Sequence, residues 1–185
     1  AEEILYGMGT EAIQSLVEGL SRPAVAEPCV RMLAQLGDRR VVPHLVKFLS
    51  SSDLAAPAAE ALLGMPDKGI PALEEALREA ATCGVAAEAL FSLGEESLER
   101  FIQALASPPA RPILVEYVLR YGAIAIDALI QALKDHTLRP GALTTLLRYG
   151  LEAVPNLIQA LKDKNAVLRP QAFQALRALP GETFD

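Results

Sequence analysis

Large hydrophobic residues recur along this chain at a nearly constant spacing. One set of positions, 28 or 29 residues apart, holds only leucine or phenylalanine: Leu16, Leu45, Leu73, Phe101, Leu129 and Leu157. A second set, four residues further on, holds only leucine: Leu20, Leu49, Leu77, Leu105, Leu133 and Leu161. Positions four residues apart lie on one face of an α-helix. The two sets therefore predict a helix with one buried face, repeated six times.

Two of the repeats are nearly identical in sequence. The segment 128–135 matches the segment 156–163 at seven of eight positions. Leu119-Arg-Tyr-Gly122 likewise returns as Leu147-Arg-Tyr-Gly150, 28 residues later. Self-similarity at a fixed period is the signature of a repeat architecture. We divide the chain into a helix tail at 1–8 followed by the units 9–36, 37–65, 66–93, 94–121, 122–149 and 150–181.

Each unit carries the pattern of two helices. In the last unit, Val154, Leu157, Ile158 and Leu161 are spaced as one helical face, and the segment 172–179 repeats that arrangement. Prolines stand where helices are expected to begin, since the first turn tolerates a missing N–H: Pro23, Pro43, Pro71, Pro112, Pro140, Pro155 and Pro170. Glycines mark the expected turns: Gly9, Gly37, Gly94, Gly122 and Gly150. A helical hairpin is therefore predicted for each unit.

These hairpins predict an all-α fold, because no segment alternates hydrophobic and polar residues as a strand does. A short hairpin cannot bury its hydrophobic face alone, so neighbouring units have to stack. We predict a right-handed α-α superhelix, or solenoid, of about six hairpins with a period of about 28 residues. It forms a single domain over 1–185. The chain opens partway through a helical pattern, so we expect truncation or a paired end.

Two motifs resemble those of a known repeat family. One is Ala89-Leu-Phe-Ser-Leu-Gly94, and the other is the segment 36–49, in which Val-Pro and a leucine-bearing helix follow a short link. With Leu-Arg-Pro at 138–140 and 168–170, the chain resembles HEAT-like repeats, in particular the subgroup named after phycobilisome lyases. The resemblance covers essentially the whole chain. It implies an α-solenoid, whereas it says little about function.

The resemblance leaves two functions open. One is a protein–protein interaction scaffold that binds its partner through a concave surface. In HEAT-like repeats this surface is lined by the second helix of each hairpin, here the helix with the two leucine positions. The alternative is an accessory subunit of a phycobilin lyase or a related pigment-handling factor, because that subgroup includes subunits that attach or remove bilin chromophores. No residue of the sequence itself selects the pigment-handling role.

Polar residues follow the same repeat beside the leucine positions. One polar set reads Glu18, Lys47, Glu75, Gln103, Gln131 and Gln159, and a neighbouring set includes His44, Arg100 and Asn156. Glutamine both donates and accepts hydrogen bonds, which suits recognition of a peptide or helix. The plainer interpretation is that recent duplication preserved Gln131 and Gln159 without a role. The residues we expect to contact a partner are His44, Lys47, Glu75, Arg100, Gln103, Gln131, Asn156 and Gln159.

Charge and composition restrict the classes of partner. The net charge is −6, whereas a nucleic-acid-binding protein usually presents a basic surface, so no nucleic acid is expected. No run of 18 apolar residues is present, so we expect no membrane span. Cys29 and Cys83 form no CxxC pair, and the chain looks like a reduced, cytoplasmic protein. We expect another protein as partner, with a homo-oligomer through the solenoid ends as a further prediction.

Residues suited to catalysis are few. Cys29 reads as a small core residue, and Cys83 reads as packing rather than as a thiol activated by a helix N-terminus. His44 and His136 are 92 residues apart in sequence and suggest no metal site. The adjacent pair Glu95-Glu96 fits a solvated helix start. We therefore predict no enzyme activity, no cofactor and no metal.

Arginine precedes proline at four equivalent places: Arg22, Arg111, Arg139 and Arg169. We expect these side chains to donate hydrogen bonds to carbonyl or acidic groups of an adjacent unit and so to stabilise stacking. Phosphate binding is the less favoured alternative.

Overall fold

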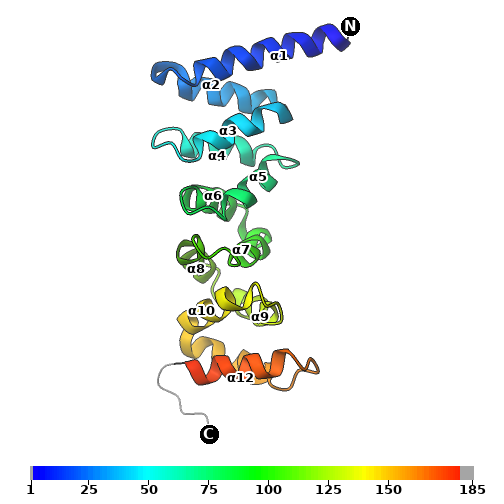
Figure 1. Cartoon of the computed structure of the whole chain (residues 1–185), viewed down its shortest axis with the longest axis vertical. Coiled ribbons are helices and arrows are strands. Elements are labelled where there is room, and N and C mark those ends of the chain that lie inside the picture. The colour runs from blue at the N-terminus through cyan, green and yellow to red at the C-terminus, as the bar shows by residue number, and fades with distance from the viewer. Residues whose placement is uncertain (1, 180–185) are drawn as a thin grey trace. The chain divides into compact units, whose positions relative to one another are not determined.

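A computed structural model describes residues 2–179, which form twelve α-helices and three short 3₁₀ helices without a strand (Figure 1). The all-α prediction is confirmed over this range. The elements are α1 (Glu2–Gly19), α2 (Pro23–Leu36), η1 (Arg39–Val41), α3 (Val42–Phe48), α4 (Ala55–Leu63), α5 (Gly69–Ala76), α6 (Cys83–Phe91), η2 (Gly94–Ser97), α7 (Leu98–Ala104), α8 (Arg111–Leu119), α9 (Ile124–Ala132), α10 (Arg139–Tyr149), η3 (Gly150–Ala153), α11 (Val154–Ala160) and α12 (Leu168–Ala178).

The chain divides into two compact units. The first takes in the residues up to Ala76 together with Gly84–Ser92, and the second takes in Leu77–Cys83 and the residues from Leu93 onward. In the first unit, α2 packs against α1 and α4, while α3, α4 and α5 contact one another. Leu45, Leu49 and Leu73 are fully buried there, as the leucine pattern predicts.

The helices of the second unit lie in two rows. Helices α7, α9 and α11 contact their neighbours in one row, and α8, α10 and α12 do so in the other. Each helix also contacts the one that follows it within its hairpin: α7 with α8, α9 with α10, and α11 with α12. The leucine positions supply the core of this unit, because six of them are buried: Leu77, Phe101, Leu105, Leu129, Leu133 and Leu157.

Prolines and glycines mark most helix boundaries as predicted. Each of the seven named prolines lies within the first three residues of a helix. Gly37, Gly94, Gly122 and Gly150 have φ between 60° and 71°, the left-handed region that glycine tolerates best. Gly9 does not form the expected turn, because it lies inside the continuous helix α1. A glycine inside a helix costs only about 1 kcal/mol relative to alanine, so it permits a turn without requiring one.

Tyrosine hydroxyls tie helix ends to the turns of the second unit, and one of them also links successive hairpins. Tyr149 at the end of α10 donates to the carbonyls of Val118 and Gly122, both at 2.9 Å. Tyr121, 28 residues earlier, donates to the Gly94 carbonyl at 3.3 Å and shares a hydrogen bond of 2.8 Å with the buried Ser97 hydroxyl. The repeated Leu-Arg-Tyr-Gly motif therefore fastens the ends of α8 and α10 to the turn at the start of their own hairpin, and Tyr149 also reaches α8 of the preceding hairpin.

Candidate protein-binding surface

All eight residues predicted to contact a partner lie on the helices that carry the leucine positions. None of them is buried: Lys47, Glu75, Gln103, Gln131 and Gln159 are exposed, and His44, Arg100 and Asn156 are half-buried. They lie on α3, α5, α7, α9 and α11. A helix that buries its leucine face leaves its opposite side to solvent, which places these polar residues there.

The second unit brings three of these residues into one pocket. Gln131 on α9 and Asn156 and Gln159 on α11 line a hollow of about 340 Å³. Asp127 from α9 and the pair Lys162 and Asp163, which follow α11, complete its polar wall. Helices α9 and α11 are neighbours in one row, so the repeat itself brings these side chains together.

Hydrogen bonds hold several of these polar side chains in place. Asn156 donates from Nδ2 to Asp127 Oδ1 at 2.7 Å, which joins α11 to α9. Gln131 Oε1 accepts from Lys134 Nζ, and Gln103 donates from Nε2 to Glu99 Oε1 at 2.8 Å. An amide side chain can donate two hydrogen bonds and accept two, so a single internal bond does not exhaust its capacity. The surface therefore presents amide groups in fixed positions.

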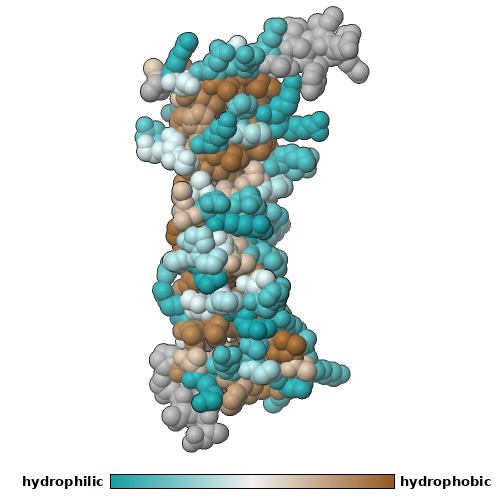
Figure 2. Space-filling model, viewed as in Figure 1, coloured by the Kyte–Doolittle hydropathy of each residue, from teal (hydrophilic) through white to brown (hydrophobic). Residues whose placement is uncertain are grey.

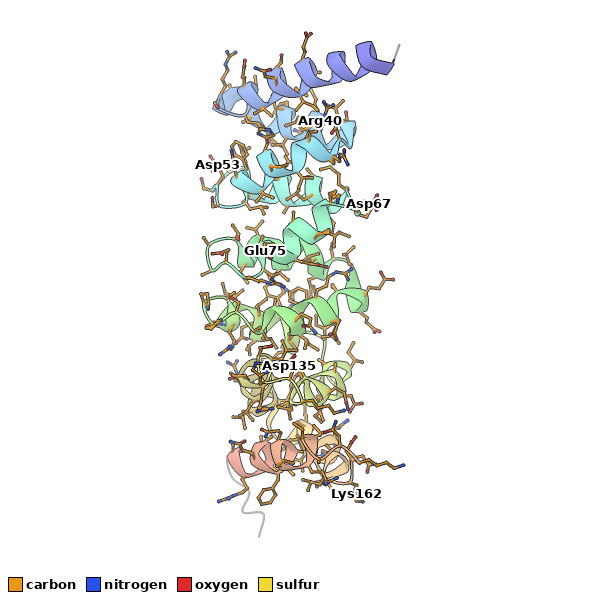
Figure 3. The ribbon with its side chains drawn as sticks, turned by 45° about the vertical axis from the view of Figure 1, so that its right-hand side comes forward. Arg40, Asp53, Asp67, Glu75, Asp135 and Lys162 are labelled. Carbon is orange, nitrogen blue, oxygen red and sulfur yellow. The ribbon has the colours of Figure 1, made fainter. Side chains whose placement is uncertain are left out.

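Asp127, Lys162 and Asp163 line this pocket but are absent from the predicted set. Asp127 precedes Gln131 by one helical turn, so the spacing of four residues was the available signal. Lys162 and Asp163 lie in the link after α11, where the helical pattern makes no statement about side-chain direction. Figure 3 shows Lys162 extending away from the ribbon of this link.

The first unit presents a different kind of hollow. His44 on α3 lines a pocket of about 240 Å³ together with Ile13, Gln14 and Val17 of α1 and with Arg40. Asp38 binds the Arg40 side chain at 2.6 Å from Oδ2 to Nη2. The Arg40 hydrogen bonds lower the pKa of the Asp38 carboxyl below its usual value. This pocket thus combines an apolar wall with an ion pair, in contrast to the amide-lined pocket of the second unit.

Three of the four arginines that precede proline donate hydrogen bonds within their own hairpin. Arg111 donates from Nε to the Leu105 carbonyl at 3.0 Å, and Arg139 donates to the Leu133 carbonyl at 2.9 Å. Arg169 donates to the Asp163 carbonyl at 2.9 Å. The predicted bonds to carbonyls are present, but the expectation that they reach an adjacent unit is wrong. The last carbonyls of a helix lack intrahelical donors, and an arginine six residues later is close enough to cap them.

Both cysteines are packed in the core, as the sequence analysis predicts, and His136 lies on the surface. Cys83 is fully buried, and burial raises the pKa of its thiol to about 11, so the thiol is protonated at neutral pH. Cys29 is buried beside Gly19, and His136 is exposed. Among the side chains that the structure describes, which leave out residues 2–8, 10 and 23, no three histidine, cysteine, aspartate or glutamate side chains lie close enough to hold a metal ion. Over the same residues no helix has both the length and the apolar character needed to cross a membrane.

No family model matches the sequence of this chain, and no curated protein matches it significantly.

Proposed function

We propose that this protein is a scaffold that binds another protein through the polar surface of its leucine-bearing helices. The observation that carries the proposal is the amide-lined pocket between α9 and α11, where Gln131, Asn156 and Gln159 lie together. We further propose that the helix pairs form a right-handed superhelix of the HEAT-like type, with this surface on its concave side. The two rows of helices in the second unit support that arrangement.

The chemistry of the pocket suits an extended peptide segment. Its amide side chains can each donate to a carbonyl and accept from an N–H, which are the two groups that every residue of an extended backbone offers. The Asn156–Asp127 bond fixes part of the pocket before binding, so less side-chain entropy is lost when a partner docks. The pocket would therefore bind an extended peptide through hydrogen-bonding side chains that are already held in place.

Site-specific photocrosslinking tests this proposal. A photoreactive amino acid placed at position 131 or 159, in the pocket, is expected to capture a protein from native lysate. The matched control position is Gln174, an exposed glutamine on α12 in the other row of helices. We expect no specific adduct at position 174. Equal capture at positions 131 and 174, or no capture at either pocket position, would refute the proposed surface.

Substitution then measures the contribution of the amides. Gln131→Ala combined with Gln159→Ala is expected to weaken binding of the captured partner by about tenfold or more, since each lost hydrogen bond is worth roughly 0.5–1.5 kcal/mol. Gln174→Ala is expected to leave the affinity unchanged. The alternative role in pigment handling stays a prediction, and visible absorbance after mixing with a free bilin would test it.

A further inference from the structure

Helix α11 exposes a side chain that the two preceding repeats bury. Ile102 in α7, Ile130 in α9 and Ile158 in α11 occupy the same repeat position, 28 residues apart. Ile102 and Ile130 are 1% and 3% exposed, whereas Ile158 is 43% exposed. Ile130 lines the pocket beside Asn156 of α11, so this position faces the next hairpin. On α11 the same side is therefore open in the described part of the chain.

The other row shows the same change at its last helix. Aligning the Arg-Pro pairs of α8, α10 and α12 places Val115, Leu143 and Phe173 at one position. Val115 is buried, Leu143 is half-buried, and Phe173 is 47% exposed. We call Ile158 and Phe173 the forward face of the second unit, because Ile130, the counterpart of Ile158, faces the next hairpin and Phe173 is the residue of its row that becomes exposed at the last helix.

A complementary face lies on α2 of the first unit. Aligning Gly37 with Gly150 places Val25, Met32 and Leu36 at the positions of Leu138, which directly precedes α10, and of Thr145 and Tyr149 in α10. Leu138, Thr145 and Tyr149 are buried, but Val25, Met32 and Leu36 are 42%, 52% and 47% exposed. Tyr149 bonds to Val118 in α8 of the preceding hairpin, so this side of a helix faces backward along the repeat. We call Val25, Met32 and Leu36 the backward face.

Charge distinguishes the surroundings of these two faces. Among the described side chains of α1, which packs on α2, Glu11 and Glu18 are exposed and there is no lysine or arginine, while Arg31 on α2 is paired with Glu27. The segment 162–177, which includes most of α12, carries Lys162, Lys164, Arg169 and Arg177 against the single acidic residue Asp163. All four of these basic residues are exposed. An apolar centre bordered by opposite charges favours association of the two faces.

We infer that copies of this protein associate head to tail, with the forward face of one copy packed on the backward face of the next. In the second unit Ile130 of α9 faces α11 and Tyr149 of α10 bonds back to Val118 of α8, so successive hairpins join a forward side to a backward side, and a second copy offers the same pair of surfaces. The interface is heterologous, because a different surface is used on each copy. Figure 2 shows hydrophobic residues at the surface over α2 to α4 and also near α12. The inference is independent of the amide-lined pocket.

Sedimentation velocity over a concentration series tests the inference with wild-type protein. We expect the weight-average mass to rise above that of a 19.7 kDa monomer as concentration increases. Two variants then separate the faces: Met32→Glu blocks the backward face, and Phe173→Glu blocks the forward face. Because both side chains are exposed, each variant is expected to keep its wild-type circular dichroism and melting temperature. Each variant alone should remain monomeric.

Mixing the two variants is the decisive measurement. Met32→Glu keeps its forward face and Phe173→Glu keeps its backward face, so the mixture should form a one-to-one dimer and nothing larger. The matched control is Ile124→Glu, a change at an apolar residue that is also exposed but belongs to neither face; it should associate like the wild type. The inference is overturned if the wild type stays monomeric, if either variant alone still associates, if the mixture stays monomeric, or if Ile124→Glu abolishes association.

Discussion

At the scale of single residues, the buried hydroxyl of Tyr149 contributes to the stability of the second unit. This hydroxyl donates to the Val118 carbonyl of the preceding hairpin and to the Gly122 carbonyl in the turn before α9, and burial raises its pKa to about 12, with Glu152 adding to the shift. The unfolded chain releases the phenol proton near the ordinary value of 10. The contribution of Tyr149 to stability is therefore complete below pH 10 and is lost as the pH rises toward 12.

Tyr149→Phe should accordingly be less stable than the wild type at pH 7–9, and the two proteins should converge between pH 10 and 12. At neutral pH we expect a difference of roughly 1–2 kcal/mol, the value of a buried hydrogen-bonding hydroxyl. Urea unfolding at a series of pH values measures it. A difference that stays constant up to pH 12 would contradict the role assigned to the phenol.

Leu105 lies very close to the backbone of Gly141, and this contact gives a second prediction for a single residue. A Cβ atom there would lie 2.6 Å from Leu105 Cβ and 2.7 Å from the Leu105 carbonyl oxygen. Gly141→Ala should therefore lower the free energy of unfolding by about 1–3 kcal/mol, although alanine favours helix. Gly84→Ala is the matched control, since a Cβ at Gly84 of α6 meets no atom within 4 Å. If the two variants melt at the same temperature, the packing described for Gly141 is wrong.

At the scale of elements, arginine side chains stabilise helix ends by donating hydrogen bonds to the last carbonyls. Arg139→Ala removes the bond to the Leu133 carbonyl at the end of α9 and a favourable charge near that helix terminus. We expect a loss of about 1–2 kcal/mol. Arg148→Ala on the same helix α10 breaks only an exposed ion pair with Glu116 at 2.8 Å and should cost less than about 1 kcal/mol. Thermal melts of both variants compare them, and an equal effect would refute the capping role.

Periodicity predicted these elements well, because burial follows the leucine positions directly. It located the helices and the proline starts, and it placed the eight polar residues on surfaces that are not buried. It misplaced the turn at Gly9, since glycine alone does not decide between a turn and a continuous helix. It also assigned Arg111 and Arg139 to the wrong carbonyls, because a pattern of residues does not specify how far a side chain reaches.

At the scale of the whole molecule, a site depends on which helices become neighbours. Gln131 and Asn156 are 25 residues apart in sequence, and they share a pocket only because α9 and α11 pack in one row. The repeat made that neighbourhood predictable, whereas the contribution of Lys162 and Asp163 depended on the path of a link. Repeat proteins are stabilised mainly by contacts between neighbouring units, so damage to one hairpin need not spread through the chain.

Leu129→Ala tests how far such damage extends. Leu129 is fully buried in α9, and its truncation should cost about 2–5 kcal/mol. Hydrogen exchange measured by mass spectrometry should show lost protection in α7 to α12 of the second unit and nearly unchanged protection in α2 to α4 of the first. Leu45→Ala, an equally buried leucine of α3, provides the reciprocal control and should affect the first unit. If either variant reduces protection equally in both units, the chain unfolds as one cooperative body, and the division into two compact units has no energetic counterpart.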